Sequence, residues 1–350
     1  MRIVITGNMG YVGPIVSQHL RNRFPESTLV GVDTCFFGHC LAGADMLPES
    51  RIDVQHFADV RDIDETVLDG ADALVLLAAI SNDPMGKAFE EVTAEVNRDA
   101  CVRLARIARE KGVGHVVFAS SCSVYGFAEG GARKEQDQLD PLTAYARSKV
   151  DTEIALEDLA NEKTLITCLR FPTACGMSPR IRLDLVLNDF VASAVATGKI
   201  QILSDGTPWR PLIDIRDMAR AIEWGILRTA EQGGRFLAVN AGRDESNYQV
   251  RALAESVHEL MPSVEIEINQ DAAPDRRSYQ VDFGLYRELA PDHLPAITLQ
   301  DSIKKLRDGL EGMGFDNADF RDSDFMRLKS LSGLREKGLL DDRLRWVRRS

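Results

Sequence analysis

The chain has 350 residues, of which 44% are hydrophobic and 27% charged, the balance of a folded globular protein. Its formal net charge of −12 disfavours nonspecific binding to nucleic acid or to acidic membranes, because both need a basic surface. No apolar run approaches the roughly 18–20 residues that cross a bilayer, so we expect a cytoplasmic protein. Six cysteines without a CxxC pair indicate neither a disulfide framework nor a metal site.

The first half of the chain alternates short apolar runs with amphipathic stretches. This rhythm predicts an α/β fold with a doubly wound parallel sheet, the Rossmann arrangement. Helices are predicted between most strands, for example over Val92–Glu110. The predicted strands are Arg2–Thr6, Thr28–Val32, Arg51–His56, Ala73–Leu77, His115–Ala119 and Thr164–Arg170.

After about Gly176 the rhythm breaks, since prolines and glycines separate shorter elements. We therefore predict a nucleotide-binding domain of residues 1–175 and 212–239, and a smaller α/β substrate-binding lobe of residues 176–211 and 240–314. Residues 315–350 combine many charges with apolar residues near helical spacing. This pattern predicts an amphipathic tail that packs on the body or on a sister subunit.

Three glycines, Gly7, Gly10 and Gly13, follow the first strand and open a helix. Residues without Cβ atoms allow a tight turn, close approach to a pyrophosphate and close packing of helix on strand. Alone, the glycines also fit an ordinary strand-to-helix turn. Asp33, about 20 residues further on at the end of the second strand, is placed to accept from both adenosine ribose hydroxyls. Its charge would repel a 2′-phosphate, so the predicted cofactor is NAD rather than NADP.

Tyr145 and Lys149 lie four residues apart on a predicted helix and therefore share one face. A phenol is a poor base at neutral pH, but a nearby ammonium and a positive nicotinamide favour the phenolate. Such pairs are common by chance. A second signal is the run Ser120–Gly126 after the fifth strand, at the sheet edge where ligands bind, because a serine there can polarise a reacting oxygen.

Together, the glycine motif, Asp33, Leu77–Ala79, Ser120–Gly126 and the Tyr145/Lys149 pair resemble the extended short-chain dehydrogenase/reductase family, especially its nucleotide-sugar epimerases and dehydratases. The resemblance implies a catalytic set of Ser121, Tyr145 and Lys149. The implied cofactor-binding residues are Gly7, Met9, Gly10, Tyr11, Val12, Gly13, Asp33, Asp59, Val60, Leu77, Ala78, Ala79, Asn97, Ser120, Tyr145 and Lys149.

For the substrate, the resemblance implies binding by Ser121, Ser123, Asn188, Arg210 and Arg277, the last three at diphosphate positions. Arg276 is an alternative to Arg277. The run Ser178–Asn188 resembles a bacterial subgroup that includes GDP-heptose 4-dehydrogenases. Within it, Arg180 and Arg182 fit a phosphate or a sugar carboxylate, and the sequence does not decide between them.

The run after Ser121 bears on the type of reaction. Dehydratases of this family carry an acid pair where Cys122 and Ser123 stand, so the usual acid for 4,6-dehydration is missing. Cys122 is an alternative acid or base, although a small buried thiol is the commoner role. We expect NAD-dependent oxidation and reduction at a ring carbon, C4, of a nucleotide-linked sugar by a homodimeric epimerase. A 4-dehydrogenase or ketoreductase, a 4,6-dehydratase and a noncatalytic NAD sensor stay open.

Overall fold

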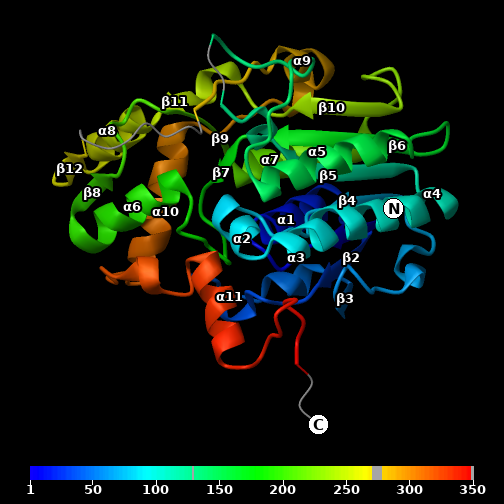
Figure 1. Ribbon diagram of the computed structural model, residues 1–350, viewed down its shortest axis with the longest axis horizontal. Helices are drawn as coiled ribbons and strands as arrows, with labels where there is room; N and C mark the ends of the chain where they lie inside the picture. The colour runs from blue at the N-terminus through cyan, green and yellow to red at the C-terminus, as the bar shows by residue number, and fades with distance from the viewer. Residues whose placement is uncertain (128–129, 270–277, 348–350) are drawn as a thin grey trace.

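The computed structural model describes residues 1–127, 130–269 and 278–347. Its centre is a seven-stranded sheet whose strands pair in parallel in the order β10-β6-β5-β4-β1-β2-β3 (Figure 1), which confirms the predicted doubly wound fold. The strands are β1 (Arg2–Thr6), β2 (Thr28–Asp33), β3 (Val54–Phe57), β4 (Ala73–Leu76), β5 (His115–Ser121), β6 (Leu165–Phe171) and β10 (Phe236–Asn240).

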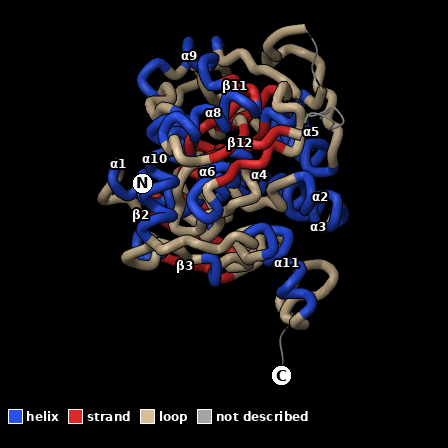
Figure 2. The backbone as a smooth tube through the Cα atoms, turned by 90° about the vertical axis from the view of Figure 1, so that its left-hand side faces the viewer, coloured by secondary structure: helices blue, strands red, loops and turns tan. Residues whose placement is uncertain are grey.

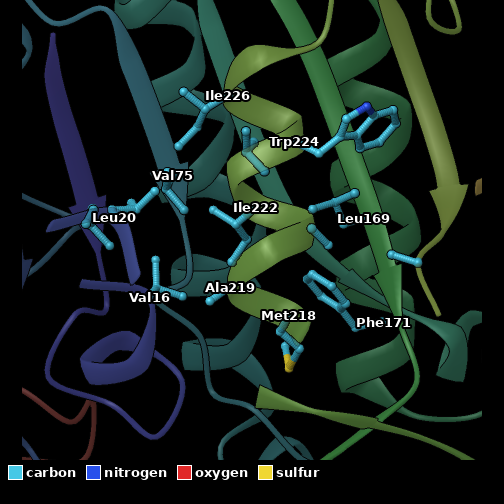
Figure 3. Close-up of a cluster of buried hydrophobic side chains, with 14 of the residues drawn as sticks. Val16, Leu20, Val75, Leu169, Phe171, Met218, Ala219, Ile222, Trp224 and Ile226 are labelled. Carbon is cyan, nitrogen blue, oxygen red and sulfur yellow. The ribbon is translucent and has the colours of Figure 1, made fainter. Parts of the chain in front are cut away.

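Helices cover both faces of this sheet because its strands are apolar on both sides. In β1, Ile3 and Ile5 belong to the core beneath α1 (Gly13–Arg23) and α7 (Ile215–Leu227), shown in Figure 3. Val4, between them, belongs to the core of the opposite face. The helices on that side are α3 (Glu90–Ala94), α4 (Cys101–Glu110) and α5 (Ala144–Glu157), with the short α2 (Asp83–Ala88) beside α5.

The sequence rhythm missed two local features of this domain. The predicted helix Val92–Glu110 contains a π-helical stretch, Glu95–Ala100, between α3 and α4. Stretches of this kind are frequent at functional sites, and this one contains the buried Asn97. The third strand begins at Val54 rather than Arg51, because Pro48–Arg51 form a 3₁₀-helix. Proline at the start of that turn sets the backbone for it.

The second half of the chain adds a smaller lobe beside the sheet, on the left in Figure 1. Its strands form a three-stranded sheet, β11-β9-β7, and a two-stranded sheet, β12-β8. These are β7 (Thr173–Cys175), β8 (Lys199–Ile202), β9 (Trp209–Asp214), β11 (Asn247–Gln249) and β12 (Glu265–Ile268). The helices α6 (Val186–Thr197), α8 (Val250–Leu260) and α10 (Leu299–Gly312) enclose a core of their own. Helix α9 (Gly284–Leu289) lies beside β10 instead and packs on the core of the large domain.

The end of the chain returns to the large domain. Helix α11 (Arg327–Glu336) and the segment after it lie against α2 and α3, and Figure 2 shows them at the opposite end of the molecule from α9. None of the described helices has the length and apolar character that a membrane span needs.

Candidate active site

A cavity of about 1040 Å³ runs along the carboxyl edge of the large sheet and into the smaller lobe. Its walls include the glycine loop after β1, Asp33 at the end of β2, Leu77–Ala79 after β4 and Ser120–Ser121 at the end of β5. In a parallel sheet these strand ends meet at one edge, which is where ligands bind in such folds. The geometry therefore brings most of the predicted cofactor residues to one place.

The glycine loop fits a pyrophosphate. Gly7 has a φ of +75°, and a Cβ there would lie 2.6 Å from the backbone nitrogen of Ala78. A Cβ at Gly13 would lie 2.3 Å from the carbonyl oxygen of Asn8, so only glycine lets α1 start so close to the loop. No side chain caps α1, whose Ncap residue is Val12. The first N–H groups of this helix thus face the cavity end where an anion would be stabilised.

Asp33 is held in place by the same loop. Its Oδ2 accepts from the backbone N–H of Met9 at 3.0 Å, and its Oδ1 accepts from that of Cys35 at 2.7 Å. Burial raises the pKa of Asp33, and these two N–H groups partly oppose that rise. Met9 itself is buried beneath the cavity rather than in its wall. What Met9 contributes in this structure is the backbone hydrogen bond that orients the carboxylate of Asp33.

Asp59 and Val60 also line the cavity, but Asp59 has a partner that the sequence reasoning did not name. Arg61 Nη2 donates to Asp59 Oδ2 at 2.6 Å, and Arg61 Nε lies 3.0 Å from both carboxylate oxygens. This ion pair could have been anticipated from the sequence, since Asp59 and Arg61 are only two positions apart. Asp59 therefore lines the cavity as half of an ion pair.

Asn97 lies behind the cavity and not in its wall, so the expected direct contact with the cofactor has no counterpart in this geometry. Its Oδ1 accepts from the N–H of Ile80 at 2.8 Å. Its Nδ2 donates to the carbonyl of Ile80 at 3.1 Å and to Ser148 Oγ at 3.0 Å. The π-helical stretch places this amide, which ties the loop after β4 to the helix that carries Tyr145.

The catalytic candidates lie together in the cavity wall. Tyr145 and Lys149 project from α5, and Ser121 ends β5. Burial raises the pKa of Tyr145 to about 12, opposed by a hydrogen bond with Ser121 and by the charge of Arg182. Burial also lowers the pKa of Lys149 to about 8, and its Nζ donates to the carbonyl of Ala119 at 2.8 Å. The arrangement suits proton transfer at an oxygen placed between Ser121 and Tyr145.

The neighbouring residues of this loop differ in what they face. Ser120 lines the cavity, but its hydroxyl donates to Glu153 on α5. Cys122 is fully buried, its Sγ is 3.1 Å from the carbonyl of Arg170, and burial raises its pKa. A thiol in this setting is a packing group rather than an acid or base for the substrate. Ser123 lines the cavity, and its Oγ has no hydrogen-bond partner among the described residues.

Of the predicted diphosphate-binding residues, one lies in the cavity wall and another lies behind it. Arg210, on β9, lines the cavity. Asn188 is fully buried outside the cavity wall: its Nδ2 donates to Tyr11 Oη and to the carbonyl of Arg182, and its Oδ1 accepts from Gly176 N–H. Its side chain therefore holds the wall instead of facing a diphosphate. Arg277 and its alternative Arg276 lie outside the described residues.

Arg180 and Arg182, whose ligands the sequence leaves undecided, lie in different surroundings. Arg180 is 2% exposed and makes a bidentate pair with Glu49, at 2.6 and 3.1 Å. Arg182 lines the cavity, donates to Asp184 at 2.7 and 2.9 Å and reaches Ser81 Oγ at 2.9 Å. Asp184 and Asp83 line the same part of the cavity. The sequence analysis predicts a role for neither carboxylate: Asp83 belongs to no motif, and Asp184 lies in the run Ser178–Asn188, where only the arginines and Asn188 are assigned.

Comparisons with known proteins identify the family of the chain. The sequence model of the "NAD dependent epimerase/dehydratase family" matches residues 3–242. An uncharacterised UDP-glucose epimerase of Bacillus subtilis (strain 168) is 27% identical over 266 residues, 73% of this chain and 82% of that protein. A dTDP-glucose 4,6-dehydratase of Streptomyces griseus is 26% identical over 312 residues, 86% and 91% of the two chains.

The solved structures give the same fold. A UDP-glucose-4-epimerase from Stenotrophomonas maltophila, with bound NAD and formylated UDP-arabinopyranose, has a TM-score of 0.76 at 20% identity. The match covers 90% of this chain and 99% of that one. At this identity the likeness establishes the fold alone. About a tenth of the present chain has no counterpart in that structure.

Proposed function

We propose that this chain, which belongs to the NAD dependent epimerase/dehydratase family, inverts a ring carbon, C4, of a nucleotide-linked sugar. The observation that carries the proposal is the grouping of Tyr145, Ser121 and Lys149 around one point of a cavity that also contains Asp33. NAD, the cofactor of this family, supplies a hydride acceptor and donor beside that point. The remaining chemistry falls to the side chains of the chain itself.

Each of the three residues has a distinct part in this proposal. Tyr145 takes the proton of the sugar hydroxyl and later returns it. Ser121 donates to the same oxygen while it carries partial charge. Lys149 holds a positive charge beneath the cofactor ribose and favours the phenolate of Tyr145. Because burial raises the pKa of Tyr145, this base depends on nearby positive charge for its activity near neutral pH.

We propose that the two parts of the chain bind the two ligands as the sequence predicts. Residues 1–175 and 212–239 would bind NAD, and residues 176–211 and 240–314 would bind the sugar nucleotide, with Arg210 and Arg277 on its diphosphate. The position of Arg210 in the cavity wall supports this part of the proposal. Six free cysteines fit a reducing cytoplasm. A homodimer is the expected assembly, and light scattering on the purified protein tests it.

A second candidate function is 4,6-dehydration with a displaced acid. It is supported by the carboxylates of Asp83 and Asp184 in the cavity wall, and by the likeness to a dTDP-glucose 4,6-dehydratase. Asp184 is less suited to act as the acid, because Arg182 outweighs its burial and keeps its pKa below the usual range, so that it is ionised at neutral pH and holds no proton to donate. Asp83 is the better acid candidate in this alternative.

One experiment separates the possible reactions. The purified protein is incubated with a panel of UDP-, GDP- and dTDP-sugars deuterated at C4, and products are analysed by mass spectrometry and NMR. An epimerase gives an isomer of unchanged mass that retains the deuterium, because the hydride returns to the same carbon. A dehydratase gives loss of water, and a dehydrogenase gives a ketone while reduced cofactor that carries the deuterium from C4 accumulates. Absence of turnover with every sugar would contradict the proposal.

A further inference from the structure

The C-terminal segment forms part of the wall of the cofactor cavity. Met326, Arg327, Leu328 and Lys329 line the same cavity as Asp33 and the glycine loop. In Figure 1 this orange-to-red segment lies along the lower side of the large domain. We call residues 326–347 the C-terminal clasp. They lie beyond residues 3–242, the range that the family model covers.

The clasp contacts the loop that follows β2, directly after Asp33, the proposed ribose-binding residue. Trp346 Nε1 donates to the carbonyl oxygen of Thr34 at 2.6 Å, and its ring centroid lies 6.0 Å from that of Phe36. The guanidinium of Arg327, a residue only 1% exposed, lies 4.3 Å from the ring centroid of Phe37. Cation–π and ring contacts of this kind fix the loop from outside.

The clasp also contacts the loop that follows β3. Arg61, which forms the ion pair with Asp59, also donates through Nη1 to the backbone carbonyl of Arg343 at 2.8 Å. Its side chain is only 6% exposed. Arg345 pairs with Asp62, and Arg343 pairs with Glu95. Asp59 and the clasp are therefore joined through a single buried guanidinium.

Apolar packing anchors the clasp to the loop and helices that follow β4. Four of its side chains are buried against Ile80, Met85, Phe89 and Val92, and these four are Leu331, Leu334, Leu340 and Leu344. One segment thus contacts the chain after β2, after β3 and after β4. These three connections surround the adenosine end of the cavity.

We propose that the C-terminal clasp is a part of the NAD site and that its docking is coupled to NAD binding. A docked clasp holds Asp33 and Asp59 in the positions that meet adenosine, and bound adenosine stabilises the docked clasp in return. Thermodynamic linkage makes the two effects equal in size. The coupling slows NAD release, which suits a reaction that returns the hydride to the same sugar. It rests on the NAD assignment and not on the identity of the sugar.

Hydrogen exchange of the unaltered protein tests the coupling directly. The protein is stripped of bound nucleotide, and exchange at the backbone amides of residues 326–347 is compared with and without added NAD. We expect exchange in the clasp to slow by about tenfold or more when NAD binds. Amides of α10, in the other lobe, serve as the internal reference. Exchange in the clasp that does not respond to NAD would overturn the proposal.

The reciprocal measurement is the rate of NAD release from a clasp variant. Trp346→Ala removes the hydrogen bond to Thr34 and the contact with Phe36, and it should speed NAD release about tenfold or more. Glu336→Ala is the matched control, because Glu336 is an exposed residue of α11. Circular dichroism verifies that both variants are folded. Equal release rates in the two variants would also overturn the proposal. Neither measurement contains a sugar nucleotide. Both therefore test the coupling even if the proposed epimerase reaction is not found.

Discussion

Glu153 and Arg170 form a bidentate ion pair next to the proposed catalytic residues, with Arg170 Nη2 2.7 Å from Glu153 Oε2. The two side chains are 5% and 6% exposed. Glu153 lies four residues after Lys149 and eight after Tyr145, so the three share one face of α5. Glu153 also accepts from Ser120, the neighbour of Ser121. The pair therefore ties β5, β6 and α5 together at the site.

Glu153→Gln should destabilise the protein strongly. The substitution leaves the guanidinium of Arg170 buried without a compensating charge, which costs about 3–5 kcal/mol in comparable buried pairs. Denaturant unfolding measures the change in the free energy of unfolding. The matched control is Arg235→Gln, which breaks the exposed pair with Glu162 and should cost under about 1 kcal/mol. Similar losses in both variants would show that the buried pair has no special role.

Tyr145→Phe should abolish most turnover and leave NAD affinity nearly unchanged, because only one hydroxyl is removed from the cavity. A loss of roughly 10² or more in turnover is expected if this phenol carries the proton. Tyr286→Phe is the control, since Tyr286 donates to the carbonyl of His293 and lies outside the cavity wall. Near-parental turnover of Tyr145→Phe would point to another base. Cys122 is a poor choice for it, because its thiol is sealed from the cavity.

Lys149→Met should move the acidic limb of the pH–activity profile to higher pH. The Nζ of Lys149 lies 5.6 Å from the centroid of the Tyr145 ring, and loss of a nearby cation disfavours the phenolate. The pKa of Tyr145, already about 12 from burial, would then lie higher still. Activity lost at neutral pH should therefore recover in part as the pH rises. A pH profile of the same shape and midpoint as the parent's would exclude this role for Lys149.

The motif-bearing residues could be predicted from sequence because each acts close to the strand end that carries it. The predicted first strand, Arg2–Thr6, has the same bounds as β1, since a short apolar run is typical of a buried parallel strand. Gly7, Asp33 and Ser121 follow such runs directly, and they meet because parallel strands end at one edge.

Residues whose partners are distant in sequence could not be predicted. Arg180 pairs with Glu49, 131 positions away, and Asn188 donates to Tyr11, 177 positions away. The resemblance assigns Asn188 to the diphosphate and leaves Arg180 open to a phosphate or a sugar carboxylate, because the sequence does not show these distant partners. The same limit applies to the tail: its helical spacing was visible, but its contact with Thr34 spans 312 residues.

Asp33 should make the protein select NAD over NADP by at least about tenfold, equivalent to about 1.4 kcal/mol. The carboxylate, oriented by Met9 and Cys35, accepts from ribose hydroxyls and repels a 2′-phosphate. Titration with both cofactors measures the ratio. Asp33→Asn keeps the shape and removes the charge, so the preference should shrink. Equal affinity of the parent for both cofactors would remove Asp33 from the ribose site.

Arg210→Ala should weaken the binding of nucleoside diphosphates without affecting NAD. Arg210 is in the cavity wall on β9, where the smaller lobe meets the catalytic residues. A charge-assisted contact from a guanidinium to a diphosphate contributes about 1.5–3 kcal/mol, so its loss should reduce affinity by roughly ten- to a hundredfold.

Calorimetry with UDP, GDP and dTDP on the NAD-loaded protein measures this effect and identifies the base. Arg147→Ala is the control, because Arg147 pairs with Glu90 on the exposed surface of the large domain. If Arg210→Ala binds as the parent does, the diphosphate lies elsewhere in the cavity. If no diphosphate binds the parent, the substrate is not a nucleotide sugar, although the NAD site and the Tyr145 chemistry would still stand.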